Sequence, residues 1–291
     1  MLSPSQSRSA EAPARAIYGL RLSGLGDYPA LPLANGEPWP EVRVVRRIAP
    51  RKSVRRGFGG RRACFELAEG RLLLERAKAT ITTVSEEPLP ADQLVHPWLA
   101  TAAGMWARWL GRDVFHGGAI ALDGGAWAVL GARERGKSTL LAALALDGHA
   151  IVADDALVLE GEYVFAGPRC VDVRPDAAAV LAPAGPVAAR GGSRRRLTLG
   201  AVPSRLPLRG IVHLTWGDEV ALERVPLPER IARLREHNAF HSLPALESTL
   251  LELAALPTVE LRRPRTLDRL SESAAALVDG LGHAGRRISS A

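Results

Sequence analysis

The hydrophobic pattern of the first third of the chain is typical of short strands. Between Ile17 and about Val84, apolar positions alternate with polar ones or come in β-branched runs, and Gly, Pro and Asn interrupt them. The runs are AIYGLRL, EVRVVRRI and ACFELAEGRLLLERAKATITTV, in which Ala-Glu-Gly joins CFEL to RLLLER and predicts a hairpin. We therefore predict a small β-rich N-terminal module over residues 16–97. A disordered tail, rich in Ser, Ala, Pro and Arg, is predicted over 1–15.

The pattern changes after a Pro-rich connection, SEEPLPADQLVHPW, which leads into a helix predicted over 94–110. Two apolar runs then flank Asp123-Gly124-Gly125, a strong hairpin signal. The segment KSTLLAALALDG predicts a short apolar helix that ends at Gly148. The next segment, HAIVADD, predicts a buried strand that ends in two carboxylates.

The rest of the chain mixes strands and helices. The segment ALVLEGEYVFAG predicts a hairpin, and CVDVRP, PLRGIVHLTWG and PTVELRRP predict single strands. Helices are predicted over 226–240, 243–256 and 267–281. The predicted fold class is α/β, with residues 98–281 as one large domain and 282–291 as a tail.

Composition and charge narrow the class of protein. Of 291 residues, 47% are hydrophobic and 24% are charged, an ordinary globular balance without a long uninterrupted apolar run. The N-terminus lacks the apolar region of a secretory signal, and Cys64 and Cys170 fit free thiols in a reducing cytoplasm. The net charge of +7 comes almost wholly from dispersed arginines, without zinc-finger spacing or an RNA-binding aromatic pattern. We expect a cytoplasmic protein that binds neither nucleic acid nor membrane.

One motif carries specific chemistry. Residues 131–138 fit the phosphate-loop pattern G-x-x-x-x-G-K-[ST], with an apolar strand before the motif and an apolar helix after it. The glycines let the backbone turn so that successive N–H groups, and the start of the helix, point at phosphate oxygens. Lys137 would supply a mobile charge for the β- and γ-phosphates, and Ser138 a hydroxyl for magnesium. The predicted nucleotide-binding residues are Gly131, Ala132, Arg133, Glu134, Arg135, Gly136, Lys137, Ser138 and Thr139.

The middle of this loop, Arg133-Glu134-Arg135, is strongly charged. Because a phosphate loop presents its backbone to the ligand, these side chains can point outward or over the phosphates. Either arginine could then contact a phosphate directly. We expect Glu134 to pair with one of the two arginines, in a surface ion pair of small worth.

Two carboxylates follow the loop. Asp154 and Asp155 come seventeen and eighteen residues after Lys137, at the end of the next predicted strand. In a parallel sheet this strand end would lie beside the phosphate loop, but adjacent strand residues point to opposite faces. One carboxylate would therefore face the metal and the γ-phosphate, and the other would reach the site only if the strand ends there. A phosphotransferase needs such groups as a magnesium anchor and as a base for the incoming hydroxyl.

Three other polar features lie near these motifs. His116 precedes the hairpin, where its spacing alone favours a structural role. His149 follows Gly148 at a predicted helix end, where a structural role is also expected. The arginine run over 194–196 is by itself typical of a solvated loop.

The order of these features resembles the catalytic core of the HPr kinase/phosphorylase family and its HPr-kinase-like relatives. The family pattern is His-Gly, a hairpin, the phosphate loop, a short helix, Gly-His and an apolar-Ala-Asp-Asp strand. Every feature appears in that order over about 115–160. The resemblance implies a P-loop kinase core of the HPr kinase/PEP carboxykinase-like type over 98–281, with C-terminal helices, after the β-rich N-terminal module.

The resemblance also implies catalytic roles. His116 matches the histidine that lies near the catalytic aspartate. Lys137 would act on phosphate and Ser138 would lie near magnesium. Asp154 and Asp155 match the paired aspartates, one a base toward the substrate serine and the other near the metal, with the order left open.

The segment CVDVRP is similar to a short form of the family's Glu-Ile-Arg segment. Asp172 would then be its acidic member, near the metal, and Arg174 its basic member. Two departures matter: Thr139 stands where the bifunctional enzymes usually carry Glu, and the extended Glu-Ile-Arg-Gly-Leu-Gly signature is absent after Asp172. Both departures argue against phosphorylase activity and against HPr itself as the substrate.

The implied function is an ATP- and Mg²⁺-dependent kinase that transfers the γ-phosphoryl group to a serine-like hydroxyl of a protein or peptide. Shorter relatives include kinases for a serine of a lasso-peptide precursor, a role that the resemblance permits without selecting. The alternatives are a small-molecule kinase of the same fold and a nucleotide-binding regulator without turnover. The combination of His116 with both aspartates favours catalysis. A homo-oligomer is expected from the resemblance, and an acidic substrate or phosphate could be held by Arg174, Arg194, Arg195 and Arg196.

Overall fold

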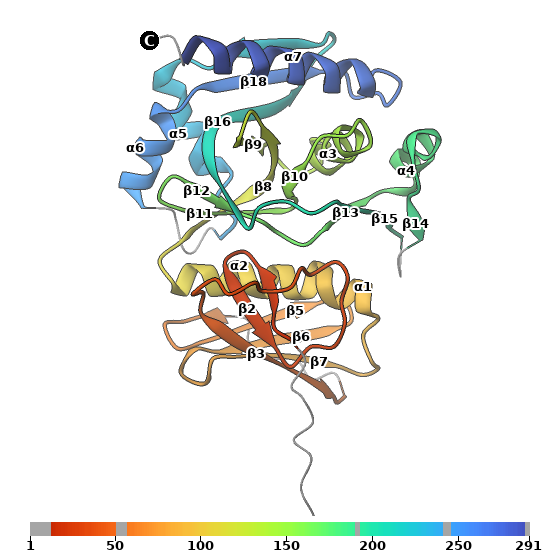
Figure 1. The fold of residues 1–291 in the computed structure, drawn as a ribbon, viewed down its shortest axis with the longest axis vertical. Coiled ribbons are helices and arrows are strands. Elements are labelled where there is room, and N and C mark those ends of the chain that lie inside the picture. Colours follow the sequence, from red (N-terminus) through yellow and green to blue (C-terminus); the bar gives the residue numbers. More distant parts are fainter. Residues whose placement is uncertain (1–12, 51–56, 190–192, 241–245, 289–291) are drawn as a thin grey trace, which may run out of the picture.

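The computed structural model describes residues 13–50, 57–189, 193–240 and 246–288, which form a mixed α/β fold. Figure 1 shows the N-terminal sheet at the bottom, a helical segment above it, and a larger sheet with its own helices on top. The predicted α/β class is confirmed. Within the described ranges, none of the helices combines the length and apolar character needed to cross a membrane.

The N-terminal sheet begins where the chain enters the described residues. Its strands, in spatial order, are β1 (Arg15–Ile17), β2 (Leu20–Ser23), β3 (Glu41–Ile48), β7 (Thr80–Ser85), β6 (Gly70–Glu75), β5 (Arg62–Leu67) and β4 (Gly57–Phe58). The predicted hairpin is β5–β6, and a short helical turn, η1 (Arg76–Lys78), leads from β6 to β7. The range predicted as a β-rich module thus contains a seven-stranded sheet. The predicted tail over 1–15 lies outside the described residues up to residue 12, and β1 already includes its last residue.

The helical segment consists of α1 (Ala91–Gln93), η2 (Leu94–Leu99) and α2 (Ala100–Trp109). Its buried side chains, including Trp98, share one core with Leu72 of the N-terminal sheet and with Val158 of the larger sheet. The segment is therefore apolar on two faces and fills the space between two sheets (Figure 1). The predicted module boundary at 97/98 is wrong, because it divides this continuous helical segment.

The larger sheet is partly closed, because some of its strands pair in a ring. They are β8 (Asp113–Leu122), β9 (Gly125–Leu130), β10 (Ile151–Ala153), β11 (Ala156–Glu160), β12 (Tyr163–Phe165), β16 (Arg205–Trp216), β17 (Ala221–Arg224) and β18 (Thr258–Arg263). The long strand β8 pairs with β11 along its first residues and with β9 along its later ones. The long strand β16 likewise pairs with β12 and then with β9. The predicted hairpins β8–β9 and β11–β12 are both confirmed.

Helices cover both faces of this sheet. The first face carries α3 (Lys137–Leu146) and α7 (Leu270–Ile288), and the second carries α5 (Leu227–Glu236) and α6 (Glu247–Ala255). Strand β9 serves both cores, because Val129 packs toward α3 and the next residue, Leu130, packs toward α5 and α6. The predicted tail over 282–291 is wrong up to Ile288, since α7 continues to that residue. The first residues of the helix predicted over 243–256, 243–245, lie outside the described residues.

A small third sheet stands beside the phosphate-loop helix. Its strands are β13 (Cys170–Val173), β15 (Arg195–Thr198) and β14 (Ala188–Ala189), and the helices α4 (Pro175–Leu181) and η3 (Ala182–Ala184) follow β13. The arginine run over 194–196 therefore enters a strand, where a solvated loop was predicted. The chain reaches this sheet directly from β12, which brings β13 close to α3 (Figure 1).

Candidate active site

The predicted phosphate loop connects the end of β9 to the start of α3. Glu134 and Gly136 both have left-handed backbone, with φ of 66° and 74°, and the first helical hydrogen bond runs from Leu140 N to Gly136 O. A Cβ atom on Gly136 would lie 2.2 Å from Nη2 of Arg263, which donates to Arg135 O and Gly136 O, and the positive φ of Gly136 would strain any other residue there. The N–H groups at the start of α3 therefore face the loop, an arrangement that suits an anion.

Lys137, the first residue of α3, folds back into this loop. Its Nζ donates to Gly131 O at 2.8 Å and to Ala132 O at 3.1 Å, and its side chain is buried. Burial lowers the pKa of Lys137, and the charges of Asp154 and Asp155 act in the opposite direction. The carbonyl oxygens of the loop thus hold the Lys137 ammonium at a position where it could contact a bound phosphate.

The charged side chains in the middle of the loop are accessible to solvent. Arg133 and Glu134 are exposed, and Glu134 accepts a hydrogen bond of 2.6 Å from Arg174 at the start of α4. The prediction that Glu134 pairs with Arg133 or Arg135 is therefore wrong. Both members of the actual pair are more than half exposed, so the pair contributes little to stability.

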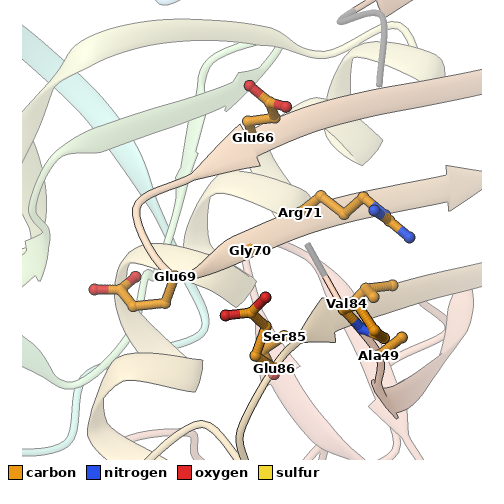
Figure 2. A pocket seen from close by; sticks show the side chains of 9 residues that line it. Ala49, Glu66, Glu69, Gly70, Arg71, Val84, Ser85 and Glu86 are labelled. Atoms are coloured by element: carbon orange, nitrogen blue, oxygen red, sulfur yellow. The ribbon is translucent and has the colours of Figure 1, made fainter. Parts of the chain in front are cut away.

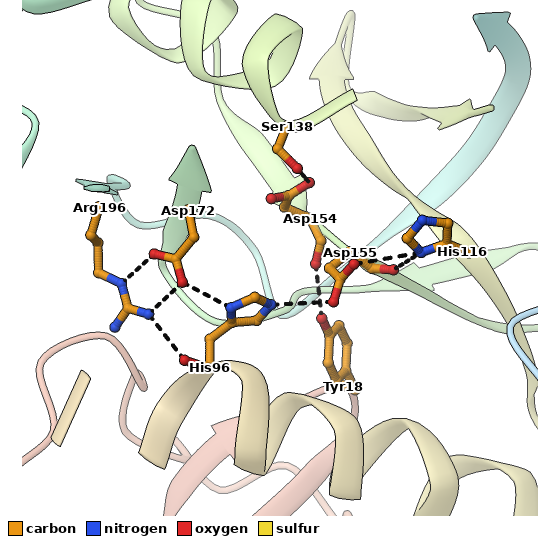
Figure 3. Close-up of polar contacts among 8 residues, drawn as sticks. All are labelled: Tyr18, His96, His116, Ser138, Asp154, Asp155, Asp172 and Arg196. Atoms are coloured by element: carbon orange, nitrogen blue, oxygen red, sulfur yellow. Dashed lines mark hydrogen bonds and ion pairs between the residues drawn. The ribbon is translucent and has the colours of Figure 1, made fainter. Parts of the chain in front are cut away.

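Asp154 and Asp155 form the turn that ends β10. The N–H of Ala156 donates to Asp154 O at 2.9 Å, and Asp155 between them has a φ of 69°. This is a three-residue turn of the rarer, strained kind. Because the strand ends at Ala153, the alternation of side chains stops. Asp154 then contacts Ser138, as Figure 3 shows, and the charges of both aspartates act on Lys137.

The strand that ends at the aspartates is not, as was expected, a direct parallel neighbour of the strand that enters the phosphate loop. β10 pairs antiparallel with β8, and β8 pairs antiparallel with β9. Strands β9 and β10 therefore run in the same direction with β8 between them. Their C-terminal ends still meet at one edge, which places the two aspartates beside the loop.

The two aspartates have different surroundings. Asp154 is buried and accepts a hydrogen bond from Ser138 Oγ at 3.0 Å, whereas the side chain of Asp155 is 47% exposed. Burial, followed by the charge of Asp155, raises the pKa of Asp154 to about 6. Burial also acts to raise the pKa of Asp155, but a hydrogen bond and charge from His96 outweigh burial and lower the pKa to about 2. The pKa values of two neighbouring carboxylates are thus shifted in opposite directions by their surroundings.

His116 lies where β8 passes from β11 to β9. Its Nδ1 donates to the carbonyl oxygen of Asp155 at 3.1 Å and lies 3.5 Å from Asp155 Oδ1. Burial lowers the pKa of His116, and the charge of Lys137 lowers it further. The next residue must be glycine, because a Cβ atom on Gly117 would lie 2.7 Å from Val129 O. His116 therefore lies beside Asp155.

A second histidine, His96, also belongs to the site and has no counterpart among the sequence predictions. It lies in η2, and its backbone is extended within that turn, with φ of −141° and ψ of 125°. Its Nδ1 is 2.9 Å from Asp172 Oδ2 and its Nε2 is 3.3 Å from Asp155 Oδ2 (Figure 3). The one sequence signal was a His-Pro pair that interrupts an otherwise helical pattern.

The N-terminal module contributes one more contact that the sequence did not indicate. Tyr18, in the turn between β1 and β2, is fully buried, and its hydroxyl donates to Asp154 O at 3.3 Å. Burial raises the pKa of Tyr18, and the charges of Asp155 and Asp154 raise it further. The backbone of the aspartate turn is therefore supported by a neutral phenol from the N-terminal module.

Asp172, which was predicted to lie near the metal, is paired with an arginine. Arg196 contacts it through two hydrogen bonds, Nε to Oδ1 at 2.7 Å and Nη2 to Oδ2 at 2.8 Å, because the two residues pair across β13 and β15. Figure 3 shows Asp172 on the side of His96 away from Asp155 and Ser138. The prediction of Asp172 as a metal ligand is thus not supported by this arrangement, in which it anchors His96.

The four arginines predicted to hold substrate fall into three groups. Arg196 is buried in the pair with Asp172, and it also donates to the carbonyl oxygens of Asp92 and His96. Arg174 is engaged with the phosphate loop, as described above. Arg194 is exposed and Arg195 half-buried, so these two remain open to a ligand in the sense predicted. The correction for Arg196 arises because its strand partner is an aspartate, which the sequence pattern alone does not reveal.

The chemistry of the donor set fits magnesium. Among the described residues, no group of three or more His, Cys, Asp or Glu side chains is arranged to hold a metal ion. Magnesium bound together with phosphates commonly takes only one or two protein ligands, all of them oxygens. The Ser138 hydroxyl and the Asp154 carboxylate supply that number and type of ligand.

Two hollows lie on the N-terminal sheet. Figure 2 shows the smaller one, between the β5–β6 turn and the end of β7, with a volume of about 10 Å³. This is room for about one water molecule. The larger one, about 560 Å³, is lined by residues of β3 to β7, among them Arg47, Phe58 and Leu73. Neither is lined by residues of the phosphate loop or the aspartate turn.

Comparison with known proteins finds likeness in structure and not in sequence. No family model matches the sequence, and no curated protein matches it. The structure is similar to that of the HPr(Ser) kinase/phosphatase from Coxiella burnetii, with 12% sequence identity and a TM-score of 0.33. The match covers 61% of this chain and 96% of that one.

Proposed function

We propose that this protein is an ATP- and Mg²⁺-dependent kinase that transfers the γ-phosphoryl group to a serine-like hydroxyl of a protein or peptide. The observation that carries this proposal is the position of Asp155. Asp155 presents a half-exposed carboxylate beside the phosphate loop. The hydroxyl of Ser138, at the end of that loop, contacts a second carboxylate, that of Asp154. A protein that only bound nucleotide would need the loop without this second, open carboxylate.

The loop and Asp154 account for nucleotide binding. The N–H groups at the start of α3 and the ammonium of Lys137 would bind the phosphates. The Ser138 hydroxyl and the Asp154 carboxylate would hold Mg²⁺, which supplies charge neutralisation on the β- and γ-phosphate oxygens when bound. A pKa of about 6 makes Asp154 mainly ionised near neutral pH, as a metal ligand must be.

Asp155 is suited to the acceptor hydroxyl. The acceptor oxygen forms a bond to the γ-phosphorus, the bond from that phosphorus to the bridging oxygen breaks, and ADP leaves. The hydroxyl proton passes to Asp155, which is ionised because its pKa is lowered to about 2. Such a weak base chiefly orients the hydroxyl and takes its proton late in the transfer.

The exposure of the site favours a macromolecular acceptor. The side chains of Asp155 and His116 are 47% and 38% exposed, so the acceptor side opens toward solvent. A serine on an extended segment can reach such a surface carboxylate, whereas small molecules usually bind in sites that bury most of their surface.

The proposal is tested with ATP labelled at the γ-phosphate. The full-length protein is incubated with Mg²⁺ and a pool of serine-containing peptides, beside a matched pool in which alanine replaces serine. Nucleotide binding is measured separately by calorimetry. Lys137→Met should abolish nucleotide binding. Asp155→Asn should bind Mg·ADP within about threefold of wild type but lose turnover by about 100-fold or more.

The remaining outcomes distinguish the alternatives. Label in a small-molecule fraction instead of the peptides would identify a small-molecule kinase. Tight Mg·ATP binding without any transfer or hydrolysis would identify a nucleotide-binding regulator. Full transfer by Asp155→Asn would show that Asp155 does not serve the acceptor hydroxyl.

A further inference from the structure

His96 stands between two carboxylates, and both of its ring nitrogens are engaged. Nδ1 lies 2.9 Å from Asp172 Oδ2, and Nε2 lies 3.3 Å from Asp155 Oδ2. An ionised carboxylate only accepts hydrogen bonds, so a ring nitrogen at this distance must carry a proton. When both aspartates are ionised, His96 is therefore an imidazolium that donates in two directions.

The two carboxylates are not equivalent partners. Asp172 is buried and already receives two hydrogen bonds from Arg196, so its negative charge is balanced within the small sheet. Asp155 has no such arginine contact in the described part of the chain. The positive charge of His96 therefore mainly balances the charge of Asp155. The contact with Asp172 fixes the orientation of the ring through its other nitrogen.

His96 also determines which oxygen of Asp155 remains open. Its Nε2 faces Oδ2, whereas Oδ1 is on the side of His116, at 3.5 Å from that ring. Figure 3 shows the carboxylate of Asp155 between the two histidines, His96 from η2 and His116 from β8. An oxygen held by a cation cannot readily take a proton, so the oxygen that meets the acceptor is Oδ1.

We propose that His96 is a positioning residue that orients the Asp155 carboxylate for phosphoryl transfer, and that the helical segment over 91–109, which packs on the N-terminal sheet, thereby completes the active site. The proposal rests on the proposed kinase function. The segment that carries His96 is itself held in place, because Arg196 donates to the carbonyl oxygens of Asp92 and His96.

The charged groups around His96 come from three elements. Asp155 belongs to the β10–β11 turn, Asp172 to β13 and Arg196 to β15, whose guanidinium contacts the His96 carbonyl. Burial acts to lower the pKa of His96, but the hydrogen bonds to Asp155 and Asp172 outweigh burial and raise the pKa to about 9. His96 is therefore charged at neutral pH and loses its proton as the pH rises through about 9.

Two conservative substitutions separate positioning from general structural support. In His96→Gln, the amide nitrogen can occupy the place of Nε2 and still donate to Asp155. In His96→Asn, the shorter amide can replace only Nδ1 and reaches only Asp172. If His96 positions Asp155, kcat should fall about 10- to 100-fold in the Asn variant and distinctly less in the Gln variant, with KM for ATP unchanged in both.

The matched control is His149→Gln, because His149 follows α3 at its far end and supports that end through its backbone N–H to Leu144 O. This control should keep wild-type kcat. The pH profile supplies a second signature, since the alkaline loss of kcat near a pH of about 9 in the wild type should be absent in His96→Gln. Equal losses in the Gln and Asn variants, with an unchanged pH profile, would overturn the proposal.

A measurement without turnover keeps this proposal separate from the kinase function. The full-length protein with ¹³C-labelled histidine is titrated by NMR, and the His96 signal is assigned from its absence in His96→Gln. We expect a pKa for His96 well above the ordinary value in the wild type and a lower one in Asp155→Asn. An ordinary pKa in the wild type would refute the positioning contact, whereas a raised pKa in a protein without kinase activity would refute only the proposed function.

Discussion

The two adjacent aspartates should respond to the same substitution with opposite changes in stability. Asp154 is 6% exposed, and its pKa is raised from 3.8 to about 6 by burial and then by the charge of Asp155. Asp154→Asn removes this buried charge. The amide oxygen can still accept the hydrogen bond from Ser138, which makes the substitution nearly isosteric.

The magnitude follows from that shift in pKa. A carboxyl group whose pKa is higher in the folded state than in the unfolded state destabilises the fold wherever it is ionised. The difference between 3.8 and about 6 is roughly two pH units, which at about 1.4 kcal/mol per unit is about 3 kcal/mol. The wild type loses this free energy as the pH rises from 3.8 to about 6, and the Asn variant does not. We expect Asp154→Asn to be more stable above that range by about 1 to 3 kcal/mol, the lower value allowing for an amide N–H without a partner.

Asp155→Asn is the matched control with the opposite sign. The pKa of Asp155 is lowered to about 2 because contacts with His96 outweigh burial. A carboxylate with a lowered pKa stabilises the fold above its ordinary pKa, and this contribution is lost as the pH falls toward 2. The Asn variant should therefore be less stable than wild type at neutral pH. Since the side chain is 47% exposed, the loss should be small.

The assay is urea unfolding of the nucleotide-free protein in a chelator, followed by circular dichroism from mildly acidic to neutral pH. The stability gain of Asp154→Asn should vanish near a pH of 3.8 and be complete above about 6. Saturating Mg·ADP should reverse the ranking, because it stabilises the wild type more than the variant that lacks the metal ligand. The reasoning is refuted if both Asn variants shift the unfolding free energy in the same direction at neutral pH.

Three further substitutions test other parts of the account. Gly136→Ala combines a φ of 74° with a Cβ atom 2.2 Å from Arg263, so nucleotide affinity measured by calorimetry should fall at least about tenfold. Arg196→Met leaves the buried carboxylate of Asp172 without its arginine, and urea unfolding should show a loss of about 3 kcal/mol or more. Glu134→Gln removes only an exposed ion pair, and urea unfolding should show no measurable change in its unfolding free energy.

The features that could be predicted from the sequence are local ones. The phosphate loop is defined by glycines and a lysine within eight residues, and the hairpin at Asp123-Gly124 by two residues that tolerate left-handed backbone. The strand before Asp154 and Asp155 was also predicted, because an apolar run and the turn after it are determined by residues that are close in the sequence. Each of these needs only short-range physics.

The features that were missed depend on contacts between distant segments. His96 lies 59 residues from Asp155 along the chain, and Tyr18 lies 136 residues from Asp154. No periodicity marks such partners. Arg196 looked like part of a solvated basic run, and only the pairing of β15 with β13 places it against a buried aspartate.

The boundary between the modules was missed for a related reason. A helical segment that is apolar on two faces belongs to two cores, and a sequence pattern does not say which surface each face meets. The segment over 91–109 therefore joins the two halves where a boundary at 97/98 was predicted. The same segment brings His96 to the aspartate turn.

The central claim is that Asp155 serves the acceptor hydroxyl while Asp154 serves the metal. The most direct measurement compares Mg·ADP affinity and γ-phosphoryl transfer to serine peptides for the wild type and the two Asn variants. The account predicts that Asp155→Asn keeps its affinity and loses transfer, and that Asp154→Asn loses the Mg²⁺-dependent part of its affinity. Retained transfer in Asp155→Asn, or unchanged Mg²⁺ dependence in Asp154→Asn, would contradict it.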